Sequence, residues 1–224
     1  TKFDAICSPW RAYCIKFGFG RKTGIDLGGE EPGNIPLAAY YNNLYSKNHW
    51  KAVTIISLAI GQGEISVTPL QLANFYAIIA NRGYYIEPHL LKNIEGVEKI
   101  NFPTINSGVD AKYFEVIAEG LKAVVEEGTG RRSKIPGISF GGKTGTAQNP
   151  HGDYHSIFAG IAPVENPDIV VAVIVENAGG GSAFAAPITS LMIEKYKNDT
   201  IMNSRKWLEK SILDAMLIDS TKLK

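Results

Sequence analysis

Residues 138–148 hold the side chains of this chain that are best suited to chemistry. They include one cation, Lys143, two threonine hydroxyls, Thr144 and Thr146, and three glycines. The apolar residues at the start of the stretch alternate with small ones, which predicts a strand with one buried face. Glycines let a ligand or another backbone approach a strand closely. Two chemistries suit such a strand, phosphate binding and acyl transfer, and the surrounding residues decide between them.

A phosphate-binding loop is the first alternative. Gly137, Gly142, Lys143 and Thr144 satisfy the pattern G-x-x-x-x-G-K-[ST]. That motif binds phosphate only between a buried strand and the first turn of a helix. Here the preceding residues are polar and broken by a proline, and the glycines and proline of residues 145–152 cannot start a stable helix. The context therefore argues against phosphate binding.

The second alternative is a strand similar to the K-T-G strand of penicillin-interacting acyl transferases, whose full signature is S-x-x-K, S-x-N and K-T-G. In that strand the lysine supplies positive charge for a carboxylate, and the hydroxyls hold the same carboxylate. A backbone amide of the strand faces the oxyanion that develops during the reaction. The run Lys143–Gln148 reads K-T-G-T-A-Q and follows a double glycine, so it is more specific than the three letters alone.

Composition limits the other possibilities. A chain of 224 residues can form one large domain or two small ones with a real core. The formal net charge of +1 gives no electrostatic case for binding nucleic acid or an anionic membrane. No run of about 18 apolar residues is present to span a membrane. The chain begins at Thr1 with neither a methionine start nor a signal peptide, which indicates a piece of a longer chain.

Apolar spacing predicts the elements that position the strand. Thr68 starts a helix with a proline in its first turn and a capping box. A second amphipathic helix ends at Gly128-Thr129-Gly130, and its apolar stripe consists of Phe114, Ile117, Leu121, Val124 and Val125. Two strands, 156–164 and 169–175, are joined by a short turn and are therefore antiparallel neighbours. The second is apolar throughout, so we expect a central strand covered on both faces.

Helices at both ends complete the chain. A helix over residues 9–17 would separate Cys7 and Cys14 by about 10 Å along its axis, whereas a disulfide requires alpha carbons within about 7 Å, so no bridge is expected. The order of helices, three consecutive strands and a terminal helix indicates an α+β fold, with an antiparallel sheet between helices. We expect residues 1–202 to be part of one domain and residues 203–224 to be a helical tail.

Four motifs in register resemble one family. Residues 24–27, 57–63, 68–73 and 143–148 resemble, in order and spacing, the transpeptidase domain of class B penicillin-binding proteins, most closely the elongation-type penicillin-binding protein 2. The similarity extends from about Trp10 to Tyr196. It implies an incomplete penicillin-binding or β-lactamase-like fold, in which residues 1–202 are the C-terminal part of a transpeptidase domain.

The resemblance also implies an activity. A serine of such an enzyme attacks the D-Ala-D-Ala bond of a peptidoglycan stem peptide, D-Ala leaves, and an amine of a neighbouring stem takes the acyl group; penicillins trap the serine ester. Lys143 would support the nucleophile electrostatically, and the Thr146 amide would complete the oxyanion hole. Thr144, Gly145, Thr146 and Gln148 would bind the donor or β-lactam. The family needs no cofactor or metal, its members work with a membrane glycosyltransferase, and they face the periplasm from an inner-membrane anchor.

The departures from the family pattern determine what this chain can do alone. No serine is followed three residues later by lysine. In the family, S-x-x-K and S-x-N both precede the segment that residues 10–20 resemble, so Ser46-Lys47-Asn48 lies on the wrong side of that landmark. We interpret these three residues as a solvated loop, because no apolar periodicity before them predicts a helix whose end would hold them. The chain is therefore expected to be inactive by itself.

Two further functions remain as alternatives. The first is a catalytically silent module that binds cell-wall peptides or β-lactams as a sensor or scaffold. The second, less favoured, is a hydrolytic β-lactamase. A metal pair at His151 and His155 is disfavoured, because a glycine and proline surround them and they do not share a helix face.

Overall fold

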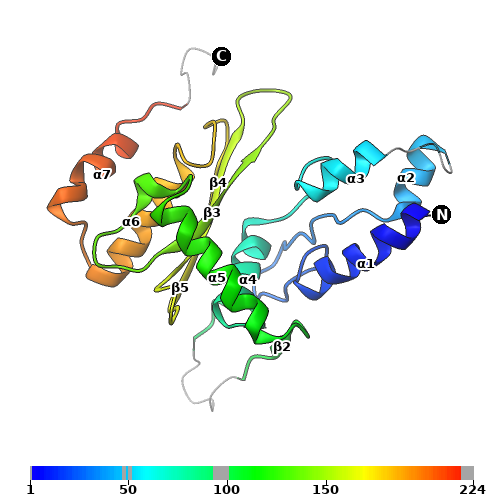
Figure 1. Cartoon of the computed structure of the whole chain (residues 1–224), viewed down its shortest axis with the longest axis horizontal. Coiled ribbons are helices and arrows are strands. Elements are labelled where there is room, and N and C mark those ends of the chain that lie inside the picture. The colour runs from blue at the N-terminus through cyan, green and yellow to red at the C-terminus, as the bar shows by residue number, and fades with distance from the viewer. Residues whose placement is uncertain (1, 47–48, 50–51, 93–100, 218–224) are drawn as a thin grey trace. The chain divides into compact units, whose positions relative to one another are not determined.

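The computed structural model describes residues 2–46, 49, 52–92 and 101–217. The chain divides into two compact units, Thr1–Asp110 and Ala111–Lys224, and its elements are labelled in Figure 1. This division falls before the second amphipathic helix, and the terminal helix belongs to the second unit. No helix of the described residues is long and apolar enough to cross a membrane.

The described part of the first unit contains four helices and two short strands. The two strands pair antiparallel, with Tyr85 opposite Ile105. The elements are α1 (Lys2–Lys16), α2 (Ala38–Tyr45), α3 (Ala52–Ala59), α4 (Pro69–Ala80), β1 (Tyr84–Ile86) and β2 (Thr104–Asn106).

Helix α4 begins as the sequence predicts. Thr68 Oγ1 accepts the amide of Gln71 at 3.1 Å, and Gln71 Oε1 accepts the amide of Thr68 at 3.0 Å, so both halves of the capping box are present. The buried Gln71 side chain also donates to the carbonyls of Arg21 and Pro32, at 2.8 Å each. Gln71 therefore caps the helix and also holds two points of the preceding chain, at residues 21 and 32.

Helix α2 corrects the interpretation of Ser46. Residues 38–45 are helical and Ser46 caps their C-terminal end, so a helix end does precede this serine. The fully buried Tyr41 holds the helix in place, and its hydroxyl donates to Glu64 at 2.7 Å. Tertiary packing forms this helix, whereas its own sequence is rich in tyrosine and asparagine. Lys47 and Asn48 lie outside the described residues.

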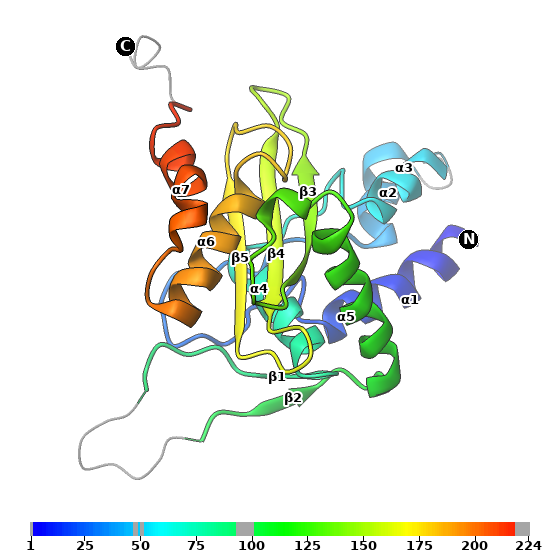
Figure 2. The same ribbon diagram turned by 60° about the vertical axis from the view of Figure 1, so that its left-hand side comes forward.

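The second unit is a three-stranded antiparallel sheet with helices (Figure 2). The strand order is β3-β4-β5, and the register places Lys143 opposite Ala159 and Ala159 opposite Ala172. The elements are α5 (Ala111–Glu126), η1 (Arg131–Ser133), β3 (Gly141–Ala147), β4 (His155–Ala162), β5 (Ile169–Val175), α6 (Ala185–Asn198), η2 (Asn203–Arg205) and α7 (Lys206–Leu213).

Two sequence-based expectations for this unit are wrong in detail. Within the described sheet β4 is the central strand and β5 an edge strand, although β5 is the more uniformly apolar of the two. An apolar run shows that a strand is suited to burial, and it does not give the position of the strand in the sheet. On α5 the predicted stripe holds for Phe114, Leu121 and Val125, but Ile117 is 49% exposed.

The core of the second unit joins one sheet face to the helices. Phe140 and Phe158 pack with ring centroids 5.8 Å apart, surrounded by Val125 of α5 and Ile193 of α6. A buried ion pair between Glu194 of α6 and Arg205 of η2 lies beside this core. The core therefore fixes the edge strand β3 relative to the end of α5 and the start of α6.

Candidate active site

Strand β3 carries the residues that the sequence singled out, and its glycines let it pack closely. A Cβ on Gly142 would collide with the ring of Phe158, and a Cβ on Gly141 would meet the backbone of α5 at Leu121 and Lys122. Both glycines are buried. The double glycine therefore lets the strand approach the core and the helix, and no side chain of these two residues limits access to the strand.

The pleat sorts the site residues by face. Thr144 pairs with Phe158 and Thr146 with Ser156, so the two threonines lie on one face, whereas Lys143 belongs to the other. The amine of Lys143 donates to the carbonyl of Thr144 at 2.7 Å, which places that carbonyl away from β4. Backbone groups of residues two apart point to the same side, so the Thr146 amide also points away from β4. Gly145 lies between the threonines.

A tight turn after α5 places a third hydroxyl beside the strand. Thr129 Oγ1 lies 2.9 Å from Thr144 Oγ1, a hydrogen bond between two hydroxyls. The flanking glycines bond back to the helix, since the Gly128 amide donates to Ala123 at 3.0 Å and the Gly130 amide to Val124 at 2.9 Å. The sequence had shown Thr129 only as part of a helix stop.

A glycine-rich loop between β5 and α6 lies against Thr146. The Gly181 amide donates to Thr146 Oγ1 at 3.3 Å. The buried Ser156 hydroxyl organises this loop, because it donates to the Gly180 carbonyl at 2.9 Å and accepts the amide of Ala185 at 3.0 Å. A Cβ on Gly181 would collide with the backbone of Gly145.

An ion pair fixes the connections at the other end of β3. Lys122 of α5 donates to Glu165 at 2.6 Å, and the hydroxyl of Ser139 donates to the same carboxylate oxygen at 2.9 Å. These two hydrogen bonds lower the pKa of Glu165 from 4.5 to about 2, and the bond from Lys122 has the larger effect. The same contact raises the pKa of Lys122. The pair is exposed, so it orients the connections more than it stabilises the fold.

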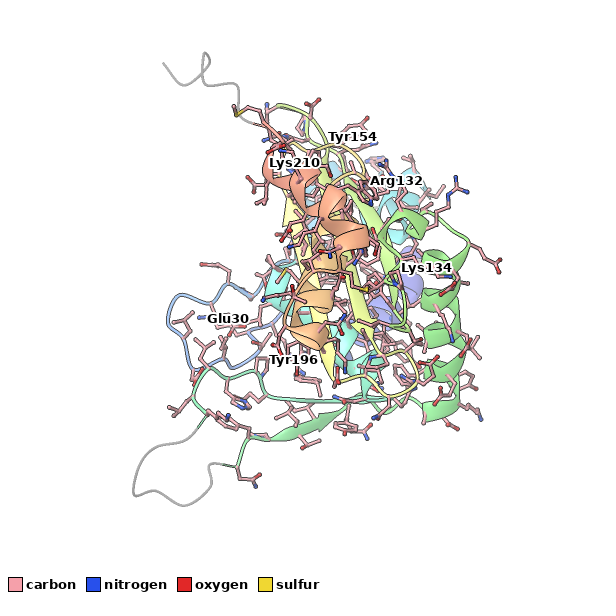
Figure 3. All side chains as sticks on the ribbon, turned by 90° about the vertical axis from the view of Figure 1, so that its left-hand side faces the viewer. Glu30, Arg132, Lys134, Tyr154, Tyr196 and Lys210 are labelled. Carbon is pink, nitrogen blue, oxygen red and sulfur yellow. The ribbon has the colours of Figure 1, made fainter. Side chains whose placement is uncertain are left out.

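The two histidines that follow β3 lie in or beside surface loops. His155 Nδ1 accepts the amide of Asn177 at 3.0 Å, while His151 lies in the exposed connection between β3 and β4. The carbonyl of Tyr154, which is labelled in Figure 3, accepts the amides of Ala178 and Gly179 at 2.9 and 2.8 Å. No group of three or more potential metal ligands occurs in the described part of the chain.

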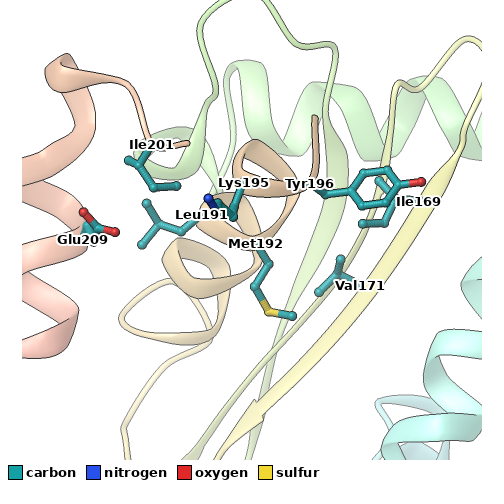
Figure 4. Close-up of a pocket in the computed structure, with 8 residues that line it drawn as sticks. All are labelled: Ile169, Val171, Leu191, Met192, Lys195, Tyr196, Ile201 and Glu209. Atoms are coloured by element: carbon teal, nitrogen blue, oxygen red, sulfur yellow. The ribbon is translucent and has the colours of Figure 1, made fainter. Parts of the chain in front are cut away.

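An apolar groove of about 590 Å³ lies elsewhere in the same unit, between β5 and α6 (Figure 4). Its floor includes Ile169 and Val171, and Met192 and Tyr196 of α6 line it. Its lining is mainly aliphatic, with Lys195 and Glu209 as its charged residues. The groove lies beside β5, an edge strand of the described sheet.

The candidate site is thus partly the one that the sequence indicated. The structure brings together Thr144, Thr146 and Gly145, and it adds Thr129. Lys143 contacts its own strand, and Gln148 follows the end of β3 as an exposed residue. The repeat of Gly-Thr-Gly just before a Lys-Thr-Gly strand is the signal that could have indicated Thr129.

Residues 7–194 match the family model of the penicillin binding protein transpeptidase domain. The match covers most of the chain, and the chain therefore belongs to this family. Its fold is the penicillin-binding fold of the transpeptidase domains, as the sequence analysis predicted.

Relatives and solved structures agree with this assignment. The chain is 36% identical over 215 residues to the peptidoglycan D,D-transpeptidase MrdA of Haemophilus influenzae, with 85% of this chain and 33% of that protein aligned. The structure resembles Pseudomonas aeruginosa PBP2 in complex with WCK 5153, with a TM-score of 0.75, 33% identity, and coverage of 84% of this chain and 42% of that one. It also resembles a peptidoglycan synthase complex that coordinates polymerization and crosslinking, with a TM-score of 0.72, 31% identity, and coverage of 89% and 34%. The chain thus spans a third of the length of MrdA.

Proposed function

We propose that the chain is the C-terminal part of a peptidoglycan D,D-transpeptidase and supplies one wall of its active site. Membership of the transpeptidase family supports the reaction class. The observation that carries the proposal is the arrangement on β3, where two hydroxyls share one face and an amide points away from the neighbouring strand. Such a strand can hold a carboxylate and a developing oxyanion at the same time.

The proposed reaction is acyl transfer through a serine ester. The serine oxygen bonds to the carbonyl carbon of the penultimate D-Ala, the amide bond breaks, and D-Ala leaves after its nitrogen gains a proton. An amine of a second stem peptide then displaces the serine and regenerates its hydroxyl. A β-lactam follows the first step, but its cleaved amide nitrogen stays attached, so the serine ester persists.

Each residue of β3 has a proposed role in this reaction. The hydroxyls of Thr144 and Thr146 donate to the carboxylate of the terminal D-Ala or of the β-lactam. The Thr146 amide donates to the oxyanion, where loss of one such donor typically costs about 10²–10³ in rate. Lys143 supplies positive charge near the nucleophile. Gly145 leaves room for the donor backbone, and Gln148 contacts the donor beyond the strand.

The nucleophile is proposed to lie outside this chain. No S-x-x-K tetrad occurs in the 224 residues, so the serine and its lysine base would come from the remainder of a longer protein. We propose that the 224-residue chain alone does not catalyse. The longer protein would be anchored in the inner membrane, face the periplasm and work with a membrane glycosyltransferase, as the likeness to a peptidoglycan synthase complex supports.

Variants of the strand in the longer protein test the residue roles. Thr144→Val keeps the shape of the side chain and removes the hydroxyl, and we expect it to lower the second-order rate constant of penicillin acylation about 10- to 100-fold, as for a hydrogen bond to a charged group. Lys143→Met should lower it as well. Thr200→Val, at an exposed position of the same unit, is the matched control and should leave the rate unchanged. Normal acylation of both β3 variants would refute these roles.

The second candidate function is a silent module that binds cell-wall peptides or β-lactams. The hydroxyls on β3 could hold a carboxylate without a nucleophile, so the observation that favours the transpeptidase also permits this function. The two differ in the covalent step. Saturable, reversible penicillin binding by the longer protein, with no ester formed, would support the silent module.

A further inference from the structure

The hydroxyl of Thr129 reaches Thr144 Oγ1 from outside β3. The two oxygens are 2.9 Å apart, an ordinary distance for a hydroxyl pair. Thr129 is exposed, whereas Thr144 is half-buried. The pair therefore lies at a solvent-facing surface of the second unit, where a ligand can reach it.

The turn that carries Thr129 is fixed on both sides. Gly128 closes the end of α5, and a Cβ at this position would collide with the backbone of Val124. Gly130 is buried against the same helix end and close to Phe158. After the turn, the amides of Arg131 and Ser133 bond to Gly128 and Gly130 at 3.3 and 2.9 Å. The Thr129 backbone is thus held in place, and its branched side chain has few rotamers.

The chemistry of hydroxyls determines the direction of the hydrogen bond once an anion binds. Each hydroxyl has one proton to donate and two lone pairs to accept. A carboxylate only accepts, so the Thr144 proton must point at the carboxylate. Thr144 can then bond to Thr129 only as an acceptor, and Thr129 must donate. The result is a chain from Thr129 through Thr144 to the ligand, in which each bond polarises the next.

We propose that Thr129 is a positioning residue for anion binding at β3. It donates to Thr144 Oγ1 and so keeps the Thr144 proton directed at the carboxylate of the stem peptide or β-lactam. The proposal rests on the carboxylate-binding role proposed for Thr144. It goes beyond that role because it places a determinant of ligand affinity on the turn after α5, outside the K-T-G strand.

The test uses the longer, serine-containing protein and the second-order rate constant of acylation by benzylpenicillin. Thr129→Val removes the hydroxyl and keeps the branched shape, and it should reduce the rate constant about 3- to 10-fold, the usual range for one neutral hydrogen bond. Thr129→Ser should restore most of the rate. Thr129→Val should cause no further loss in a Thr144→Val background, because the relay acts through Thr144. Thr200→Val again serves as control, and thermal melts check that each variant is folded.

A second probe separates positioning from a structural effect. The methyl ester of benzylpenicillin offers an uncharged, weaker acceptor in place of the anionic oxygen, so Thr129→Val should reduce its slow acylation less than that of the acid. If the valine variant is unfolded, a comparison of Thr129→Ser with Thr129→Ala gives the same information, because both residues are smaller than threonine.

The outcomes separate the relay from the proposed function. If Thr144→Val slows acylation and Thr129→Val does not, the relay is wrong and the role of Thr144 stands. An equal loss from Thr129→Val in both backgrounds, or with acid and ester alike, also overturns the relay. If Thr144→Val itself has no effect, the role of Thr144 fails and the relay fails with it.

Discussion

Breaking the buried ion pair of Glu194 and Arg205 should strongly destabilise the second unit. Glu194 is fully buried and Arg205 is 5% exposed. The guanidinium also donates to the Ser190 hydroxyl at 2.6 Å, and the second carboxylate oxygen accepts the Met202 amide at 2.8 Å. Arg205→Met would leave a buried carboxylate without its counter-charge. Removal of one partner of such a pair typically costs about 3–5 kcal/mol.

That cost is large for a unit of this size. Domains are usually stable by about 5–15 kcal/mol, so Arg205→Met should remove about a fifth or more of the free energy of unfolding. The double variant Glu194→Met/Arg205→Met removes both charges and leaves the Met202 amide without its acceptor, which costs about 1–3 kcal/mol. We therefore expect the double variant to be no less stable than Arg205→Met alone. If the two substitutions acted independently, their separate losses of stability would add in the double variant.

Urea unfolding can measure this difference directly. Trp207 lies two residues after Arg205 and is the one tryptophan of the second unit, so its fluorescence in a Trp10→Phe/Trp50→Phe background reports on this region. Lys210→Met, in an exposed ion pair with Asp214, is the control and should change the stability by less than about 1 kcal/mol. A loss below about 1 kcal/mol in Arg205→Met, or additive losses in the double variant, would refute the reasoning.

Three other predictions concern the supports of the candidate site and of the first unit. Ser156→Ala leaves the buried amide of Ala185 without its acceptor and should cost about 1–3 kcal/mol in urea unfolding; a change within error would show that the loop does not depend on this hydroxyl. The pKa of Glu165 is lowered from 4.5 to about 2, so its contribution to stability is complete above pH 4.5 and is lost as the pH falls towards 2. Ser139→Ala should raise this pKa in an NMR titration, and an unchanged value would contradict the assigned hydrogen bond. Thr68→Ala should cost about 1 kcal/mol through loss of the α4 cap, as measured by thermal unfolding, while Thr68→Ser should not.

Local signals made part of this fold predictable. The capping box at Thr68 depends on residues three apart, and it is present as predicted. The strands β4 and β5 follow from apolar runs on either side of a short turn, and their antiparallel pairing is confirmed. The family resemblance was equally readable, because four motifs keep their order and spacing.

Features that depend on the topology could not be read from the sequence in this way. Helix α2 forms because Tyr41 is buried, and the local sequence of α2 does not predict a helix. The edge position of β5 depends on the pairing of the sheet. The contact of Thr129 with Thr144 joins residues 15 apart across a helix end and a strand, and it requires the two glycines to place the turn. Each of these three features is determined by tertiary contacts, which the local sequence pattern does not specify.

The apolar surface of the second unit has a consequence for the isolated chain. The groove beside β5 exposes Met192 and Tyr196, which are 51% and 58% exposed. Exposed apolar surface next to an edge strand of the described sheet favours association. The isolated chain should therefore be studied at low concentration, with its oligomeric state measured in parallel.

The intact mass after incubation with benzylpenicillin tests the central claim most directly. The 224-residue chain and a version extended at its N-terminus by the preceding residues of its gene would be treated side by side. We predict that the extended protein gains the mass of one penicillin and that the 224-residue chain gains none. A stable adduct on the 224-residue chain would contradict the claim that its nucleophile lies elsewhere, and the absence of an adduct on both would contradict the transpeptidase assignment.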